Sequence, residues 1–403
     1  MKKSIVIFGY GQRGAIYAGY SKFRENEFEV VAIIENNLEK LDEIRKQYSC
    51  PIFTDYQEFL KQNIKADIVA IATQDATHKE HAIAFLEKGY DLLLEKPIAT
   101  SLEDVVAIYD AAVRYSRKVI VCHVLRYTPF YRRVKEIIKS GVLGEIVNIS
   151  ASENVGFYHQ AHSFVRGPWK NSLESSPMIL AKCCHDMDIL RWLIDKKCWS
   201  VASFGELSYF KKENQPLGAS QYCSDCKVEN CIYKAQKIYI DYKWMAKYYN
   251  NKENTDENIL KELIHTDYDR CVFDSNNNVV DHQCTIMQFE NGVVANHTMT
   301  AFSKEIYRDL KIHGTKAELC GNVEDNCLEL RVFGGDVQKI DLGAGEVLYG
   351  GHAGGDMGMM HEVYMDLNGE KTLGISYIDV SVDSHKMAFG AEKSRTTKTI
   401  VQI

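Results

Sequence analysis

The sequence feature that most constrains the fold is a three-glycine turn that directly follows an apolar segment near the start of the chain. Residues 5–8 are Ile-Val-Ile-Phe, and glycines follow at positions 9, 11 and 14. In a G-x-G-x-x-G turn, Gly9 permits the tight bend, Gly11 lets backbone amides approach phosphate oxygens, and Gly14 lets the next helix pack against the strand. The positive N-terminal end of that helix then faces the phosphates. We therefore predict a dinucleotide site, with a turn that binds no ligand as the alternative; its residues are Gly9, Gly11, Gln12, Arg13 and Gly14.

A second apolar segment, residues 29–34, ends in the acidic residue Glu35. A carboxylate at this position accepts hydrogen bonds from the ribose hydroxyls of the adenosine and repels a 2′-phosphate. The residues that follow, Asn36, Asn37 and Leu38, include no arginine that would bind such a phosphate. The sequence therefore favours NAD over NADP.

The composition limits the class of protein. The 403 residues are enough for two or three domains. The net charge of −7 argues against a nucleic acid or an anionic membrane as partner. The first strand follows the N-terminus without a signal peptide, and no apolar run approaches the roughly 18 residues of a membrane span. Twelve cysteines in such a chain indicate reduced thiols or metal ligands, and we expect a cytoplasmic protein.

The first part of the chain alternates strand-like and helix-like segments. Apolar segments at residues 67–73, 91–94 and 118–121 are separated by sequence with helical periodicity. Alternation of this length indicates a doubly wound parallel sheet, whose ligands bind beyond the carboxyl ends of the strands. Residues 1–125 are therefore predicted to form an NAD-binding Rossmann domain.

The pattern changes after this point. A helix is expected from Pro177 to about residue 193. Residues 283–289 and 293–299 then alternate apolar and polar positions around Glu-Asn-Gly, as in an antiparallel hairpin. Residues 126–403 are predicted to form an α/β domain with a mostly antiparallel, open sheet. Within it, residues from about 210 to 280 are rich in Lys, Tyr and Asn and are interpreted as an insertion.

The strand at residues 91–94 ends in the tripeptide Glu95-Lys96-Pro97. Together with the glycine turn and Glu35, this tripeptide resembles the motif of the Gfo/Idh/MocA family, named for glucose–fructose oxidoreductase and inositol dehydrogenase. The resemblance covers the whole chain. It implies NAD(P)-dependent oxidation or reduction of a carbohydrate or polyol (a sugar, sugar derivative or cyclitol) by a homodimer or homotetramer. It also implies that further residues line the cofactor: Thr73, His78, Glu95, Lys96 and Pro97.

Oxidation of a hydroxyl requires a base for the proton and a cation beside the developing alkoxide. Lys96 fits the cation, unless it is a solvated surface lysine. His185 matches the histidine that the family uses as acid/base or substrate contact, although a histidine on such a helix can also be structural. The family's aspartate four residues earlier is replaced by Ala181, and Lys182 stands three residues before His185 on the same side of the helix. Lys182 is therefore predicted to lower the pKa of His185 or to bind a substrate anion.

The absent aspartate keeps another enzyme class open. Some relatives resemble NAD-dependent glycosidases, in which transient oxidation acidifies a neighbouring C–H bond, elimination cleaves the glycoside, and the hydride returns. Such an enzyme shows no net turnover of the cofactor. The third hypothesis is a protein that binds or senses NAD without catalysis.

Residues 153–169 combine histidines, an arginine and aromatic side chains after a predicted strand. Flat apolar faces with polar tips suit a sugar ring and its hydroxyls. With residues at the end of the last Rossmann strand, they are predicted to bind substrate, each against a structural alternative: His123, Arg126, Tyr127, Tyr158, His159, His162, Arg166 and Trp169. Residues 352–356 form either a pocket loop or a simple turn.

The insertion contains a cysteine pattern, Cys223-x2-Cys226-x4-Cys231, with Cys271 near its far end. Four thiolates at such spacing can hold Zn²⁺ in a tetrahedral site. A metal would stabilise a segment that has little intrinsic order. Structural zinc is therefore predicted, with free cysteines and an iron–sulfur cluster as alternatives.

Overall fold

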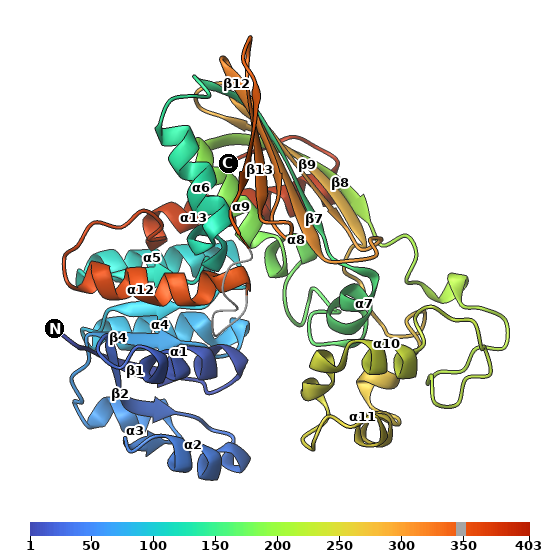
Figure 1. Ribbon diagram of the computed structural model, residues 1–403. Helices are drawn as coiled ribbons and strands as arrows, with labels where there is room; N and C mark the ends of the chain where they lie inside the picture. The colour runs from blue at the N-terminus through green and yellow to red at the C-terminus, as the bar shows by residue number, and fades with distance from the viewer. Residues whose placement is uncertain (344–351) are drawn as a thin grey trace.

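The computed structural model describes residues 1–343 and 352–403, which form two sheets with helices packed between and around them (Figure 1). The first sheet is entirely parallel, in the order β3-β2-β1-β4-β5-β6, which is the order of a doubly wound dinucleotide-binding sheet. The predicted fold class is confirmed for this part. Its strands are β1 Lys3–Phe8, β2 Phe28–Ile34, β3 Ile52–Phe53, β4 Ile68–Ile71, β5 Leu92–Leu94 and β6 Val119–Val121.

Helices connect these strands, and some of them begin at polar side-chain caps. The Asp55 side chain accepts a hydrogen bond from the Gln57 amide, and Ser101 accepts one from the Asp104 amide, so each satisfies a free N–H at a helix start. The helices of this part are α1 Gln12–Phe23, η1 Leu38–Lys40, α2 Leu41–Gln47, α3 Tyr56–Lys61, η2 Asp75–Thr77, α4 His78–Glu87 and α5 Leu102–Tyr115.

The second sheet is mostly antiparallel, as predicted, in the order β14-β13-β12-β11-β7-β10-β9-β8-β15. Its parallel pair joins β7 and β10. Helices cover one face, and side chains of the other face, such as Phe204 and Ile286, are exposed. Its strands are β7 Ile146–Asn154, β8 Cys198–Glu206, β9 His282–Phe289, β10 Val294–Thr300, β11 Tyr307–Gly314, β12 Ala317–Asn322, β13 Cys327–Val332, β14 Val337–Asp341 and β15 Val401–Gln402.

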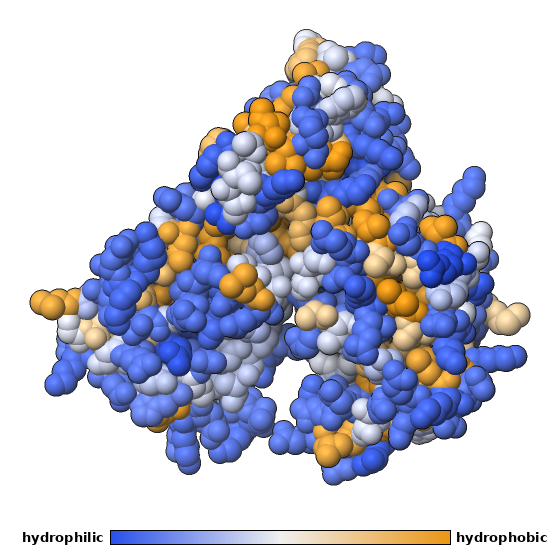
Figure 2. Space-filling view, turned by 180° about the vertical axis from the view of Figure 1, so that it is seen from behind, coloured by the Kyte–Doolittle hydropathy of each residue, from blue (hydrophilic) through white to orange (hydrophobic). Residues whose placement is uncertain are grey.

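The segment between β8 and β9 forms a separate lobe with its own apolar core, which includes Tyr239, Ile259 and Phe273 (Figure 1). Seen from behind, the surface of this lobe is separated from the first domain at the end away from the second sheet (Figure 2). Its helices are η5 Lys212–Asn214, α10 Ala235–Asp241, η6 Lys243–Tyr248, α11 Asp256–Leu263 and η7 Asp267–Asp269.

The last helices return to the first sheet and tie the two halves together. Met360 of α12 packs in the core of the first domain, and Val382 of α13 packs on its other face, while Met387 of α13 packs under the second sheet. No described helix combines the length and apolar character that crossing a membrane requires. The remaining helices are η3 Val124–Tyr127, α6 Pro129–Lys139, α7 Phe157–His159, η4 Gln160–Arg166, α8 Met178–Ala181, α9 Cys184–Ile194, η8 His352–Gly354, α12 Gly355–Leu367 and α13 Ile378–Thr397.

Candidate active site

The three glycines that follow β1 differ in the space that a side chain at each position would meet. Gly9 has a φ of +88°, and a Cβ there would lie 2.6 Å from the carbonyl oxygen of Ala72. A Cβ at Gly14 would lie 1.8 Å from the carbonyl oxygen of Gly9. A Cβ at Gly11, by contrast, would meet no described atom within 4 Å. Packing therefore requires Gly9 and Gly14, whereas the space beside Gly11 is open, as close approach of a pyrophosphate needs.

The carboxylate of Glu35 lies against this turn. It accepts a hydrogen bond from the Tyr10 amide at 2.7 Å and another from the Asn37 amide at 2.8 Å. These bonds fix a buried carboxylate at the end of β2, where an adenosine ribose is bound in such folds. The Lys40 ammonium lies 3.9 Å from Glu35 and was not singled out from the sequence.

Arg13 and Glu95, both predicted to bind cofactor, bind each other. Arg13 Nε lies 2.6 Å from Glu95, and its guanidinium lies 2.6 Å from Asp356, which is at the start of α12. Burial raises the pKa of Glu95, but Arg13 and the Tyr17 hydroxyl lower it further, so that the pKa lies below its usual value. We infer that this ion pair holds the turn, the end of β5 and α12 together.

Lys96 reaches from the first domain to the second. Its Nζ donates to the Ala181 carbonyl oxygen at 3.1 Å, and its own amide donates to Glu95 at 3.0 Å. The helix expected across Pro177 to residue 193 is broken between α8 and α9, at Lys182 and Cys183. Ala181 is the last residue of α8, where carbonyl groups lack partners within a helix, so its oxygen is available to Lys96.

The residues around Pro97 also hold one another. The Lys96–Pro97 peptide bond is cis. In the fully buried ring of His78, Nδ1 lies 2.9 Å from the Pro97 carbonyl oxygen and Nε2 lies 3.2 Å from the Thr73 carbonyl oxygen. His78 thus connects the ends of β4 and β5 and supports the loop that carries Lys96.

His185 lies at the start of α9, one turn beyond Ala181. Burial, followed by the charge of Lys96, lowers the pKa of His185 well below its usual value, so the imidazole is neutral. Its ring centroid is 5.9 Å from that of His123 and 5.9 Å from that of His352. His352 belongs to residues 352–356, for which the sequence allowed either a pocket loop or a simple turn. Among the described residues, its buried Nδ1 has no hydrogen-bond partner.

The predicted pair of Lys182 and His185 is not formed. Lys182 Nζ instead lies 3.0 Å from the Glu153 carboxylate at the end of β7. Arg308 of β11 also pairs with Glu153 and lies 3.0 Å from Asp186. The break before α9 turns Lys182 toward the second sheet, and we infer a structural role for it in place of the predicted catalytic one.

The same cluster contains three buried potential ligands, Cys183, Asp186 and His297, whose ligand atoms lie within 4.8 Å of one another. The Arg308 guanidinium already pairs with Asp186, so the charge of this carboxylate is balanced without a metal ion. We therefore assign no metal to this cluster.

Arg126 and Tyr127, predicted to bind substrate, are buried and contact other side chains. Arg126 forms two hydrogen bonds of 2.6 Å with the fully buried Asp188 carboxylate. The Tyr127 hydroxyl lies 3.4 Å from the Ser376 hydroxyl. These residues join the first domain to α9 and to the C-terminal segment.

Aromatic residues of the insertion surround the predicted histidines. His162 stacks on Tyr268 with ring centroids 4.9 Å apart and lies 3.0 Å from the Tyr239 hydroxyl. Tyr158 stacks on Tyr242 at 3.6 Å. Tyr158 was predicted to bind substrate, whereas Tyr239, Tyr242 and Tyr268 were not predicted because the insertion lacks a periodic pattern.

His159 and Trp169, the other two predicted ring-bearing residues, lie in different surroundings. His159 lies 6.0 Å from Trp244 between ring centroids, and its buried Nδ1 has no partner among the described residues. Trp169, by contrast, packs on Phe164 and the core of the second sheet. We therefore infer that Trp169 has a packing role in the core of the second domain.

The insertion also reaches the glycine turn. The Tyr248 hydroxyl of η6 lies 3.3 Å from the Gln12 amide oxygen at the start of α1. This contact joins the insertion to the first domain, whose ribbons form the two lower lobes in Figure 1. Gln12, predicted to bind cofactor, thus lies where the insertion faces the cofactor turn.

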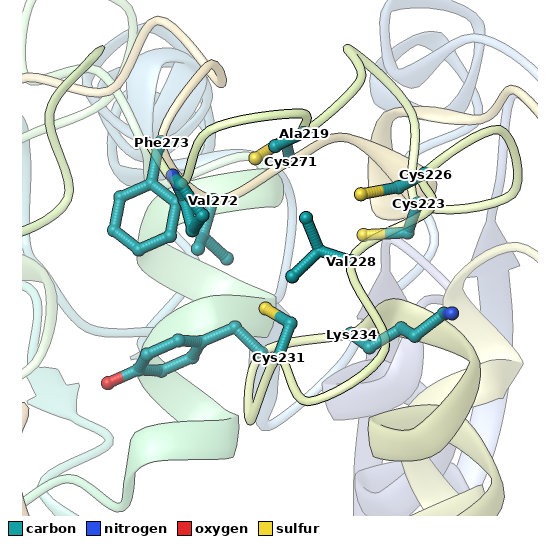
Figure 3. A pocket seen from close by; sticks show the side chains of 11 residues that line it. Ala219, Cys223, Cys226, Val228, Cys231, Lys234, Cys271, Val272 and Phe273 are labelled. Carbon is teal, nitrogen blue, oxygen red and sulfur yellow. The ribbon is translucent and has the colours of Figure 1, made fainter. Parts of the chain in front are cut away.

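The four predicted metal ligands line one small cavity: Cys223, Cys226, Cys231 and Cys271 (Figure 3). Zinc holds its thiolate sulfurs roughly 3.8 Å apart. Among the described residues, the sulfurs of these cysteines form no group of three within 4.8 Å of one another. The site is therefore assembled as expected, but its spacing does not support zinc.

Comparison with known proteins agrees with this architecture. Residues 3–123 match "Oxidoreductase family, NAD-binding Rossmann fold", and residues 135–380 match "Oxidoreductase family, C-terminal alpha/beta domain". YteT of Bacillus subtilis, provisionally named an oxidoreductase, is 25% identical over 325 residues, which are 75% of this chain and 72% of YteT.

Two further relatives carry names of dehydrogenases. Inositol 2-dehydrogenase 2 of Saccharopolyspora erythraea is 30% identical over 140 residues, only 34% of this chain and 38% of that protein. A levoglucosan dehydrogenase in complex with NADH and levoglucosan has the same fold, with a TM-score of 0.72 over 100% of both chains at 17% identity. The parallel sheet with its glycine turn and the antiparallel domain behind it make this chain a member of the Gfo/Idh/MocA oxidoreductase family.

Proposed function

We propose that the protein is an NAD(H)-dependent oxidoreductase that moves hydride between nicotinamide and a carbinol carbon of a sugar, sugar derivative or cyclitol. One observation carries the proposal: Lys96 extends from the end of a Rossmann strand to the last residue of α8, one turn before His185 at the start of α9. The names of the inositol and levoglucosan dehydrogenases support the substrate class.

The chain supplies both groups that the proton transfer requires. A bound nicotinamide accepts or donates the hydride. The neutral His185 can take the hydroxyl proton, and the Lys96 ammonium stabilises the negative charge that develops on the substrate oxygen. Because burial, and after it the same ammonium, keeps the imidazole unprotonated, His185 is at neutral pH in the form that can accept the proton.

The residues fit NAD in preference to NADP. The open space beside Gly11 accommodates a pyrophosphate, and the Glu35 carboxylate disfavours a 2′-phosphate. The neighbouring Lys40 offsets part of that repulsion. We therefore propose a preference for NAD that Lys40 moderates.

Buried histidines provide the polar contacts for the substrate. Both ring nitrogens of His123 and Nδ1 of His159 and His185 are buried and have no hydrogen-bond partner among the described residues. His123 Nε2 lies 3.7 Å from the Asp188 carboxylate, which is beyond hydrogen-bond distance. Buried polar atoms normally have hydrogen-bond partners. We propose that substrate hydroxyls complete these bonds, and that the aromatic rings near His159 contact the apolar face of the sugar.

A panel assay tests this function. The protein is incubated with NAD⁺ and a set of cyclitols, aldoses and anhydrosugars while NADH absorbance is followed, and NAD⁺ binding is measured by calorimetry. Stoichiometric NADH formation, abolished by Lys96→Ala and His185→Ala, is expected. Absence of both NADH formation and NAD⁺ binding would overturn the proposal. Cleavage of an aryl glycoside with no net NADH release would instead indicate the oxidation–elimination reaction.

A further inference from the structure

One side of η6 in the insertion carries an exposed indole and an ammonium group. Met245 and Ala246 are buried in the core of the insertion, whereas Trp244 is 45% exposed and Lys247 is also exposed. Residues three apart in a 3₁₀-helix lie one above the other, so Trp244 and Lys247 share one side of the segment. Lys247 Nζ lies 6.0 Å from the centroid of the Trp244 ring. The core of the insertion therefore does not account for this tryptophan.

The indole lies next to two of the predicted substrate histidines. The centroid of the Trp244 ring is 6.0 Å from that of His159 and 6.4 Å from that of His162. The ring planes are inclined by 67° and 66°, so neither imidazole stacks flat on the indole. Part of the indole surface beside these histidines is therefore open to a ligand.

The other end of η6 lies against the first domain. The Tyr248 hydroxyl donates to the Gln12 amide oxygen at 3.3 Å, and its ring centroid is 4.7 Å from that of His162. Burial raises the pKa of Tyr248, and the Gln12 bond and the charge of Lys96 offset part of this rise, so Tyr248 lies within reach of the field of Lys96. Tyr248, His162 and Trp244 thus form an aromatic row that begins near Lys96 and ends at the exposed indole.

The aromatic row is longer than one sugar ring. Four residues of a 3₁₀-helix rise roughly 8 Å, which separates the backbone positions of Trp244 and Tyr248. A pyranose ring is shorter than this distance. A sugar whose carbinol lies at Lys96 therefore leaves the exposed end of the row uncovered.

We propose that Trp244 binds a second sugar ring, so that the substrate is a glycoside or a disaccharide whose reacting ring lies at Lys96. An indole offers a flat apolar surface to the C–H groups of a pyranose face. The apolar contact near His159 thus belongs to the second ring and not to the reacting one. Lys247 forms no ion pair in residues 1–343 and 352–403, and its ammonium can donate to a hydroxyl of the second ring. The position of the reacting ring rests on the proposed oxidoreductase function.

Calorimetry with matched pairs of sugars tests the proposal. The protein, with and without NAD⁺, is titrated with glucose and cellobiose, with galactose and lactose, and with myo-inositol and galactinol. In at least one pair, the glycoside should bind about tenfold more tightly than its one-ring partner, because only the glycoside reaches the indole. Equal binding within every pair, or no binding of any glycoside, would overturn the proposal.

Tryptophan variants locate the effect. Trp244→Ala should lower the affinity for the preferred glycoside by about tenfold and so remove most of the preference, and Trp244→Phe should keep part of it. Trp199→Ala, at a 59% exposed tryptophan of β8, is the matched control and should keep the whole preference. Thermal denaturation verifies that each variant is folded. A preference that survives Trp244→Ala, or an equal loss of affinity for both members of the pair, would contradict the assignment.

The outcomes separate this inference from the proposed function, because calorimetry detects the second ring without hydride transfer. A preference for a glycoside with no NADH formed would contradict the oxidoreductase and leave the second-ring site. NADH formed from one-ring sugars, with no preference for any glycoside, would support the oxidoreductase and overturn the second-ring site.

Discussion

The edge of the first sheet and the charged cluster of the second domain, called the wall here and made of Glu153, Lys182 and Arg308, are positioned in different ways. At the sheet edge, Gly11, Glu35 and Lys96 each come within a few residues of the end of a parallel strand, so the sheet order alone brings them together. In the wall, Glu153 of β7 is held by Lys182 and by Arg308 of β11, which is far away in the sequence. Groups at strand ends can thus serve a ligand, whereas charged groups in the wall largely serve one another.

The two lysines give the largest expected contrast. Lys96→Ala should lower kcat by roughly 10²- to 10⁴-fold with little loss of stability, because its ammonium stabilises charge in the transition state. Lys182→Ala should instead lower the free energy of unfolding by about 1–3 kcal/mol, since it leaves Glu153 with Arg308 as its remaining partner. Steady-state kinetics and urea denaturation of both variants measure the contrast. A Lys182→Ala enzyme that is stable but inactive would restore the catalytic role predicted from the sequence.

Two glycines of one turn sharpen the contrast between packing and binding. Gly14→Ala should destabilise the fold by about 1–3 kcal/mol or more, because its Cβ would collide with backbone at Gly9. Gly11→Ala adds a methyl group to open space, so it should leave the melting temperature unchanged but weaken NAD⁺ binding by about tenfold. Thermal denaturation and calorimetry separate the two effects. Unchanged NAD⁺ affinity in Gly11→Ala would place the pyrophosphate elsewhere.

His385 of α13 contacts the backbone of Ile98, just after β5, and its titration predicts how the free energy of unfolding depends on pH. Its Nε2 accepts from the Ile98 amide at 3.0 Å and its Nδ1 donates to the Ser381 carbonyl oxygen at 2.9 Å. Burial, followed by the charge of His123, lowers the pKa of His385 to about 3. The stability from the neutral ring is therefore complete above the unfolded pKa of about 6.5 and is lost as the pH falls toward 3.

His385→Gln keeps an acceptor for the Ile98 amide and removes this titration. Between about pH 6 and pH 4, the variant should lose up to about 1.4 kcal/mol less unfolding free energy per pH unit than the wild type. Urea denaturation at several pH values gives both slopes. Equal slopes would mean that His385 is protonated in the folded protein.

The smallest predicted effect concerns the cofactor. Glu35→Ala should raise the ratio of kcat/KM for NADP⁺ to that for NAD⁺ by about tenfold, because the repulsion of a 2′-phosphate is lost while Lys40 remains. Glu39→Ala, at an exposed carboxylate nearby, is the control. An unchanged ratio in Glu35→Ala would remove Glu35 from the ribose site.

The sequence predicts the two regions unequally for the same physical reason. Strand periodicity and the glycine turn are local patterns, so both sheets and the positions of Gly11, Glu35 and Lys96 could be predicted. The break between α8 and α9 carries no proline or glycine, and an unbroken helix wrongly placed Lys182 beside His185. No local pattern states which distant charge a buried lysine or arginine will pair with, and the tyrosines of the insertion lack periodicity altogether.

We propose that nicotinamide lies where the two regions meet, which a crystal structure of the protein with bound NAD⁺ can decide. The nicotinamide ring is expected beside the end of β5, with Lys96 Nζ and the His185 ring both facing the space in front of its reactive carbon. A nicotinamide bound with either side chain turned away from that space would disprove the proposal.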